Sequence, residues 1–173
     1  MKVSFRKVVL PGEKKWLVAF DHKIFRRADR FRSDDWDRYE SYWMLVNGRR
    51  VGCCAFERAA DFEVDPYRDS APRSGSLYIA STGILPQHRG KGFGVRFKRW
   101  QIAWARRHKF NRIVTNCRSS NRAIIRLNEK FGFKILKSTT GNYYHQPAEP
   151  AVIMELRLSK RHVARRAHKL TPQ

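Results

Sequence analysis

The chain has 173 residues, of which 42% are hydrophobic and 13% aromatic, and this composition excludes a chain that is disordered along its whole length. No apolar run approaches the ~20 residues of a membrane-spanning helix, and the first residues lack the apolar segment of a secretion signal, so we expect a cytoplasmic protein. The length predicts one domain over residues 1–158, followed by a basic tail over residues 159–173.

The formal net charge of +22 is distributed unevenly along the chain. Residues 1–70 hold 15 Lys/Arg and 12 Asp/Glu, whereas residues 71–173 hold 22 Lys/Arg and only Glu129, Glu149 and Glu155. A field of one sign attracts phosphate-bearing partners and speeds their encounter. We therefore expect an anionic partner on the C-terminal half. Three interpretations of the basic surface stay open, namely solubility, an acidic acceptor or a nucleic acid.

The first part of the chain predicts a strand followed by two helices. Residues 4–10 are expected to form the strand, which Pro11-Gly12 ends. Apolar residues between positions 16 and 25 recur at helical spacing and predict the first helix. Ser33 is followed closely by three aspartates, which predicts the N-cap and acidic first turn of the second helix.

A hairpin is expected next, over residues 42–46 and 51–56. The dipeptide Asn47-Gly48 between them supplies the two positive-φ positions of a type I′ turn. Residues 58–76 lack a sustained period and predict a long loop on the substrate side.

The rest of the chain alternates between strand and helix patterns, which predicts a right-handed α/β core. The aromatic residues of the long helix share one face, so we interpret them as core packing. The three cysteines stand among apolar residues of predicted strands and are interpreted as buried free thiols. The expected elements are strand 77–85, helix 93–109, strand 112–117, helix 121–131, and strands 133–136 and 152–158, with a loop over 141–150.

A glycine-rich segment, Gln87-His88-Arg89-Gly90-Lys91-Gly92-Phe93-Gly94, stands directly between a predicted strand and a predicted helix. Glycines at alternate positions let the backbone turn tightly and approach a ligand. The N–H groups of the first helical turn then converge on a spot where the helix dipole also favours negative charge. This geometry suits a pyrophosphate, although the patterns of dinucleotide and nucleoside-triphosphate loops are both absent.

A second motif follows about thirty residues later, with Asn121 at a helix start and Glu129-Lys130-Phe131-Gly132-Phe133 at its end. Together the two motifs resemble the GNAT superfamily of acyl-CoA-dependent N-acyltransferases, over residues 77–133. The resemblance implies an α/β fold of three layers (α+β), with a mixed, mostly antiparallel, twisted sheet. About six to seven strands, splayed at the centre, would be flanked by about four helices.

The resemblance also implies acetyl-CoA as cosubstrate, without a metal. Asn121 would contact the pantetheine arm, although a helix N-cap explains an Asn equally well. Arg89, Lys91 and Arg96 could add charge near the phosphates. The pantetheine would also contact the backbones of Ile84 and Leu85 and the side chain of Asn128. The pyrophosphate would be held by Gln87 and by the amides of Arg89, Gly90, Lys91, Gly92, Phe93, Gly94 and Val95.

In this family the amine attacks the thioester directly, without a covalent enzyme intermediate. The protein must deprotonate the amine, polarise the carbonyl, for which the Leu85 N–H is a candidate, and protonate the leaving thiolate. The tyrosine that usually gives this proton is replaced by Asn128, and an amide is no general acid. Water and nearby positive charge could stabilise the thiolate, or Tyr144 or Tyr143 could replace the missing acid.

The general base is open between Glu57, His145 and a water relay. We expect an N-acetyltransferase that acts on a primary amine of a peptide, protein or small molecule. The alternatives are a tRNA- or other nucleic-acid-directed acetyltransferase or binding module, and an acetyl-CoA sensor without turnover. The acceptor is expected among the loops at 26–40, 58–76 and 139–150, and the protein is expected away from membranes as a monomer or homodimer.

Overall fold

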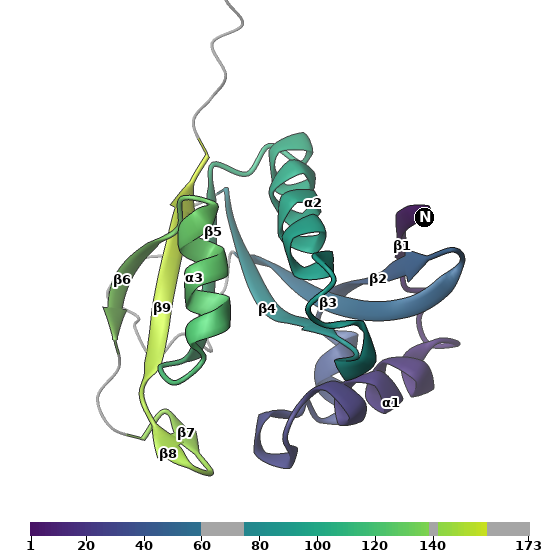
Figure 1. Cartoon of the computed structure of the whole chain (residues 1–173), viewed down its shortest axis with the longest axis horizontal. Helices are drawn as coiled ribbons and strands as arrows, with labels where there is room; N and C mark the ends of the chain where they lie inside the picture. Colours follow the sequence, from purple (N-terminus) through teal and green to yellow (C-terminus); the bar gives the residue numbers. More distant parts are fainter. Residues whose placement is uncertain (60–74, 139–141, 159–173) are drawn as a thin grey trace, which may run out of the picture.

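The computed structural model describes residues 1–59, 75–138 and 142–158 (Figure 1). The basic tail and most of the predicted loop at 58–76 lie outside the described residues. Among the described residues, no helix has the length and apolar character needed to span a membrane.

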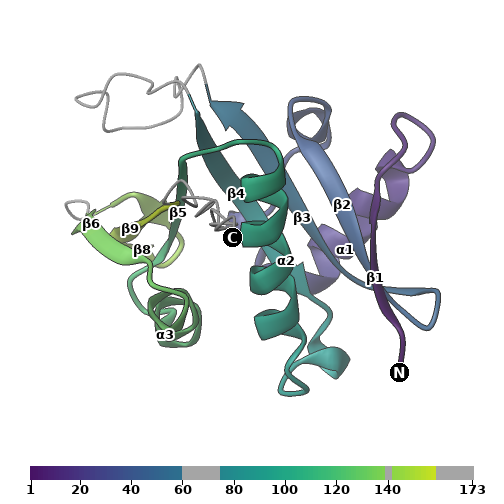
Figure 2. The same cartoon turned by 90° about the horizontal axis from the view of Figure 1, so that it is seen from above.

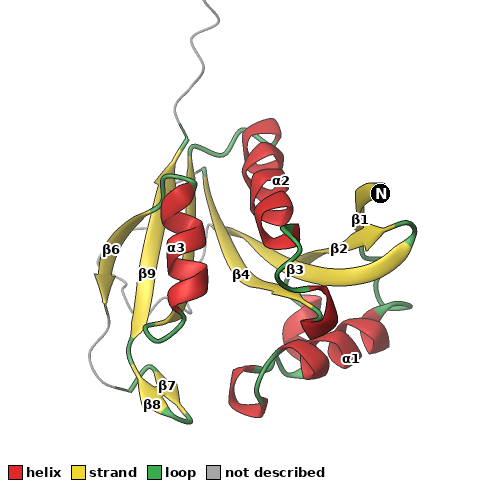
Figure 3. Cartoon of the chain, in the orientation of Figure 1, coloured by secondary structure: helices red, strands yellow, loops and turns green. Residues whose placement is uncertain are grey.

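A seven-stranded mixed sheet forms the centre of the molecule, in the order β1-β2-β3-β4-β5-β9-β6 (Figure 3). The pair β4-β5 is parallel and all other neighbours are antiparallel. The strands are β1 (Val3–Lys7), β2 (Glu40–Val46), β3 (Arg49–Ala59), β4 (Ser76–Ile84), β5 (Arg112–Arg118), β6 (Lys134–Ser138) and β9 (Ala151–Arg157), with a separate hairpin of β7 (Tyr144–His145) and β8 (Ala148–Glu149).

The helices lie on both faces of this sheet, as predicted. They are α1 (Lys14–Ile24), α2 (Phe93–Arg107) and α3 (Arg122–Lys130), with 3-10 helices η1 (Arg27–Asp29), η2 (Ser33–Asp37) and η3 (Pro86–His88). The predicted mixed sheet with flanking helices is confirmed. The second predicted helix is shorter than expected, because β2 begins at Glu40 and leaves room only for the 3-10 helix η2. Ser33 is its first residue and Arg32 its N-cap, so the predicted N-cap at Ser33 is wrong by one position.

Two hydrophobic cores fill the space between these layers. On the side of α2 and α3, Phe97 and Trp104 pack with Phe56 of β3, which confirms that the helix aromatics face the core. On the side of α1, Leu17 packs with Trp43 of β2. The three cysteines are buried and free, as predicted. Figure 2 shows α1 and α2 on opposite sides of the sheet.

The turn between β2 and β3 has the predicted conformation, with φ of 48° at Asn47 and 79° at Gly48. The predicted loop over 141–150 contains more structure than expected. Its described part folds into the short hairpin β7-β8, in which Tyr144 pairs with Glu149.

The strands β4 and β5 separate after a short parallel ladder. Their register runs from Ser76↔Arg112 to Ile79↔Thr115, and both strands continue beyond it without pairing to each other. At this point the register with β3 shifts so that Ala80 is skipped, which marks a β-bulge in β4. The two strands diverge below the ladder in Figure 1, so the splayed centre that the resemblance implied is present.

A buried carboxylate fixes the chain just after α1. Asp21 is 1% exposed, and its Oδ2 accepts the N–H of Phe31 at 3.2 Å. Its Oδ1 has no hydrogen-bond partner within the described part of the chain. Burial raises the pKa of Asp21 from 3.8 to about 7. The folded protein therefore holds a proton at mildly acidic pH that the unfolded chain releases.

We expect the contribution of Asp21 to stability to fall as pH rises from about 4 to 7, because the folded state binds the Asp21 proton more tightly than the unfolded state. Asp21→Asn removes this dependence and keeps an acceptor for the Phe31 N–H. The variant should match the wild type near pH 4 and exceed it by on the order of 1–3 kcal/mol at pH 8, measured by chemical denaturation.

The matched control is Asp37→Asn, which removes an exposed carboxylate paired with Lys14 Nζ at 2.6 Å. Its effect should be small and should not follow the same pH course. A gain in Asp21→Asn that is constant across pH would contradict the assignment.

Candidate functional site

The glycine-rich loop connects β4, through η3, to the start of α2. Gly90 and Gly92 have φ of 73° and 76°, a region that other residues adopt at a cost. A Cβ built at either position meets no atom within 4 Å, so the turn itself rather than packing requires glycine. Gly92 is also the N-cap of α2.

Six successive backbone N–H groups, from Gly90 to Val95, have no acceptor among the described residues. Their neighbours are engaged, because the Arg89 N–H donates to Pro86 O at 3.1 Å and the Arg96 N–H to Gly92 O at 3.2 Å. These six groups stand at the N-terminus of a 15-residue helix, where the helix dipole adds positive potential. They fit an anionic pyrophosphate, whereas the expected contribution of the Arg89 amide is wrong in this conformation.

The basic side chains of the loop brace its backbone. The Arg89 guanidinium donates to Ile84 O and to Ile24 O, both at 3.0 Å, so it ties the loop to the end of α1. Lys91 Nζ donates to Gln87 O at 3.0 Å. The side chains of Gln87 and Arg96 are exposed. The contacts of Arg89 and Lys91 give them a structural role beside the expected electrostatic one.

A cavity of about 290 Å³ lies where β4 and β5 separate. Its lining comes from three parts of the fold. The strands contribute Tyr78, Ile79, Ala80, Ser81, Thr82, Thr115, Asn116, Cys117 and Arg118, the helices α2 and α3 contribute Lys98, Asn121, Ile124 and Asn128, and the segments after α1 and at β7 contribute Phe25, Asp29, Phe31, Tyr39, Tyr143 and Tyr144. The cavity thus joins the two faces of the sheet.

The edge of β4 that faces this cavity is open. Beyond Ile79, β4 pairs with β3 alone, so its backbone groups on the β5 side have no strand partner over residues 80–84. An open strand edge offers N–H and C=O groups to any extended chain with amides. This edge leads from the cavity to the glycine-rich loop.

Leu85 does not fill the predicted role of a carbonyl donor. Its N–H donates to Val51 O at 2.9 Å, so it is not free to polarise a bound carbonyl. Ile84 O likewise accepts from Arg89 Nε. The free backbone donors lie earlier, near the bulge at Ala80, and a bulge leaves no readable signal in one sequence.

Asn121 and Asn128 both line the cavity. Asn121 caps α3, since its Oδ1 accepts the Ile124 N–H at 3.3 Å, so the structural explanation for this residue is present. Asn128 is 1% exposed, and its Nδ2 lies 3.5 Å from Met154 Sδ. Its Oδ1 is buried and has no hydrogen-bond partner in the part of the chain that the structure describes. A buried amide oxygen without a partner is costly, which is typical of a binding position.

Lys98 is a cavity residue that the sequence reasoning missed. It is 2% exposed, and burial lowers the pKa of its ammonium to about 8. Its position could have been read from the sequence, because it shares the core-facing stripe of α2 with Phe97 and Gln101.

Tyrosine hydroxyls lie on the opposite wall. The Tyr78 OH donates to Asn116 Oδ1 at 2.7 Å, and Asn116 Nδ2 donates to the Tyr143 OH at 3.0 Å. The Arg118 guanidinium stands 4.3 Å from the ring centre of Tyr144. Burial raises the pKa of Tyr144 above its ordinary value, so its hydroxyl keeps its proton at neutral pH. Tyr144 thus reaches the cavity, as the prediction of its role requires.

The two predicted bases lie outside the cavity lining. Glu57 Oε1 lies 3.9 Å from Arg38 Nη2. Burial is the main cause of the raised pKa of the Tyr39 hydroxyl, and the negative charge of Glu57 is the second. His145 is exposed. Asp29 does line the cavity, but Arg118 engages it.

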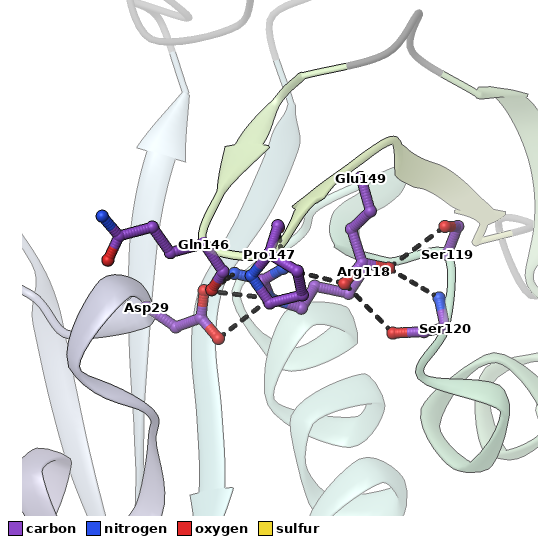
Figure 4. Close-up of polar contacts among 7 residues, drawn as sticks. All are labelled: Asp29, Arg118, Ser119, Ser120, Gln146, Pro147 and Glu149. Carbon is purple, nitrogen blue, oxygen red and sulfur yellow. Dashed lines mark hydrogen bonds and ion pairs between the residues drawn. The ribbon is translucent and has the colours of Figure 1, made fainter.

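Arg118 joins the segments on this side of the cavity (Figure 4). Its Nε donates to Asp29 of η1 at 2.9 Å, and its Nη1 donates to Glu149 of β8 at 2.8 Å and to Pro147 O at 3.0 Å. The hydrogen bond from Arg118 holds the pKa of Glu149 at about 2. A guanidinium with several fixed acceptors is well suited to hold two loops in one geometry.

We expect Arg118→Gln to lower the free energy of unfolding by about 3 kcal/mol, because it leaves two partly buried carboxylates without a cation. Hydrogen exchange should accelerate in residues 25–31 and 144–149. Arg112→Gln is the matched control, since Arg112 pairs with Glu155 at the other end of β5. It should cost stability but leave exchange in those two segments unchanged, and equal exchange in the two variants would contradict the role of Arg118.

Comparison with known proteins agrees with this geometry. The family model described as "Acetyltransferase (GNAT) family" matches residues 13–133. The chain therefore belongs to the GNAT family of acetyltransferases and is an acyltransferase. The predicted resemblance is confirmed. No curated protein sequence matches the chain.

Solved structures share the fold at low sequence identity. The ribosomal-protein-S18-alanine N-acetyltransferase from Escherichia coli has a TM-score of 0.73 at 15% identity, covering 94% of this chain and 99% of that one. Ard1 from Thermoplasma volcanium has a TM-score of 0.69 at 15% identity, with 92% and 100% covered. An acetyltransferase of Bacillus subtilis in complex with CoA has a TM-score of 0.69 at 16% identity, with 91% and 100% covered.

The GNAT family uses acetyl-CoA, and the six free N–H groups and the open β4 edge are suited to its pyrophosphate and pantetheine parts. The described residues contain no group of three or more His, Cys, Asp or Glu side chains placed to hold a metal ion.

Proposed function

We propose that this protein transfers the acetyl group of acetyl-CoA to a primary amine that enters the cavity from the aromatic side. The observation that carries the proposal is the continuity of the site. The open edge of β4 connects the cavity, at Ala80 to Thr82, with the six free N–H groups that begin at Gly90. At ~3.3 Å per residue, the edge from Ala80 to Ile84 spans roughly 13 Å, which suits an extended pantetheine arm.

The residues divide the work along this path. The N–H groups of residues 90–95 bind the pyrophosphate, and the open β4 edge pairs with the pantetheine amides. When bound, acetyl-CoA supplies an activated acetyl thioester. Backbone donors near the bulge at Ala80 polarise its carbonyl, in place of the engaged Leu85 N–H.

For the loss of the amine proton we propose a water relay through the cavity. Asp29 is the carboxylate of the described cavity lining, and Arg118 engages it. Glu57 lies on β3 opposite Tyr78 of the cavity lining, and its charge contributes to the raised pKa of Tyr39, so we propose it as the carboxylate at which such a relay ends.

The acceptor wall favours an amine with an apolar or aromatic neighbour. It consists mainly of rings, which are Phe25, Phe31, Tyr39, Tyr78, Tyr143 and Tyr144. Its charged groups neutralise each other in the Arg118 network. This chemistry fits the amino terminus of a peptide or protein, or a small amine with an apolar substituent, better than a polyamine with a second cation.

We expect Gly92→Val to weaken acetyl-CoA binding at least tenfold, because a β-branched side chain strains the turn at a φ of 76° and so displaces the N–H groups on either side of it. Gly48→Val is the matched control. Gly48 has a φ of 79° and equally open surroundings, but it lies in the β2-β3 hairpin. Calorimetric titration should show a loss of affinity in the first variant alone, and equal affinity in both would contradict the proposed site.

The acceptor class is tested by incubating the full chain with acetyl-CoA and pooled peptides, small aromatic amines, polyamines or aminoacyl-tRNA, followed by mass spectrometry. The proposal expects acetylated peptide or small amine. Product on aminoacyl-tRNA alone would instead favour the nucleic-acid-directed alternative. Tight acetyl-CoA binding without any product would favour a sensor.

A further inference from the structure

Lys98 is a charged side chain within an apolar stripe of α2. The residue is 2% exposed, lies between buried neighbours such as Phe97 and Ile102, and lines the cavity. Its ammonium stands 5.1 Å from the ring centre of Phe133. Within the described residues it has no hydrogen-bond or ion-pair partner. Arg118, the other cation of the cavity lining, is fully engaged.

Such a lysine is expensive for the folded protein. Burying an ammonium without an acceptor destabilises the folded state until an anion pairs with it. Besides burial, the groups that influence its pKa are the thiols of Cys54 on β3 and Cys117 on β5. Burial raises the pKa of both thiols, that of Cys117 to about 11, so neither supplies a resident anion at neutral pH.

Lys98 lies on the same side of the cavity as Asn128, the residue that replaces the expected general acid. It shares one wall of the cavity with Asn128, which occupies the place where GNAT enzymes commonly carry the tyrosine that protonates the thiolate. Asn128 itself contacts Met154 and has no proton of suitable acidity. Tyr144 reaches the cavity from the opposite wall, beside Arg118.

We propose that Lys98 is the catalytic residue that stabilises and protonates the sulfur of coenzyme A as it leaves. This assignment rests on the proposed acetyl transfer. The acceptor nitrogen forms the new C–N bond, the C–S bond breaks, and its electron pair goes to sulfur, which takes a proton from Lys98 Nζ. The nitrogen gives its surplus proton to water, and Lys98 regains one from solvent through the cavity, so charge and protons balance.

The acidity of Lys98 suits this step. Its pKa of about 8 lies close to the value of ~8.5 for an ordinary thiol, so proton transfer between the two is nearly thermoneutral. Lys98 must be protonated to act. The rate should therefore be sustained below pH 8 and fall above it as the ammonium loses its proton.

Lys98→Met tests the proposal, because it keeps the length and volume of the side chain and removes the charge. We expect unchanged acetyl-CoA affinity, a kcat at pH 7 reduced about 100-fold with little change in the acceptor KM, and loss of the decline above pH 8. Arg99→Met, at the next and exposed position of α2, is the control and should leave all three unchanged. Asn128→Tyr added to Lys98→Met should recover at least tenfold.

A binding measurement decides the point without turnover. Coenzyme A and desulfo-coenzyme A, in which hydrogen replaces the thiol, are titrated into the full chain from pH 6.5 to 9. If the ammonium pairs with the thiolate, the wild type prefers coenzyme A by at least fivefold near pH 8, and Lys98→Met abolishes the preference. Equal affinity for both ligands in the wild type would overturn the proposal.

The outcomes distinguish a failure of the proposed function from a failure of the role assigned to Lys98. If acetyl-CoA does not bind the wild type, the proposed function fails. If it binds and transfer occurs but Lys98→Met keeps its kcat and pH profile, Lys98 is a structural residue. A low kcat in Tyr144→Phe, with Lys98→Met unaffected, would assign the acid to Tyr144. A thermal stability of Lys98→Met that equals or exceeds that of the wild type shows that a lost rate is not a loss of fold.

Discussion

The separation of β4 from β5 is the constraint on which the rest of the site depends. A parallel pair normally continues for the length of both strands, because each unpaired buried N–H or C=O costs free energy. Here four residue pairs join β4 to β5, and β4 then separates from β5 at the bulge at Ala80. The molecule thereby gains an open strand edge and a passage between its two faces.

Within the lining of the cavity, the two faces of the sheet differ in how buried polar groups are paired. On the side of α1, Arg118 is surrounded by carboxylates and carbonyls that fix the segments around it (Figure 4). On the side of α2 and α3, Lys98 and the carbonyl oxygen of Asn128 lie buried without such partners among the described residues. A fully satisfied network rigidifies a structure, whereas an unsatisfied polar group marks a place where a ligand gains affinity. The fold keeps its rigid charges and its unpaired ones on opposite walls.

Local patterns in the sequence were sufficient to predict most of the fold. The hairpin at Asn47-Gly48, the glycine-rich loop and the cap at Asn121 each have a conformation that only a few residue types adopt, so they could be read directly. The second helix was overestimated, because its length is limited by where β2 begins and not by its own capping residues. The hairpin β7-β8 was missed because its strands have two residues each.

The part of the candidate site that local backbone conformation forms was predictable from the sequence. The part that depends on contacts between residues far apart in the chain was less predictable. The N–H groups of the loop follow from local geometry, whereas the engagement of Leu85 by Val51 depends on how β3 reaches the end of β4. The Arg118 network unites residues that are up to 89 positions apart in the chain. Lys98 was visible in the helical period of α2, but its meaning required knowing that Asn128 shares its cavity wall.

The two hydrogen bonds of the Arg89 side chain connect the glycine-rich loop to the segment on the other face of the sheet. One guanidinium donates to Ile84 O at the end of β4 and to Ile24 O at the end of α1. Close to this point, a Cβ at Gly83 would lie only 2.4 Å from the Ile24 side chain, so strand and helix are already in contact. The glycine-rich loop and the end of α1, which leads to the cavity residues Phe25 and Asp29, therefore share one point of attachment. Neither can be redesigned or displaced without moving the other.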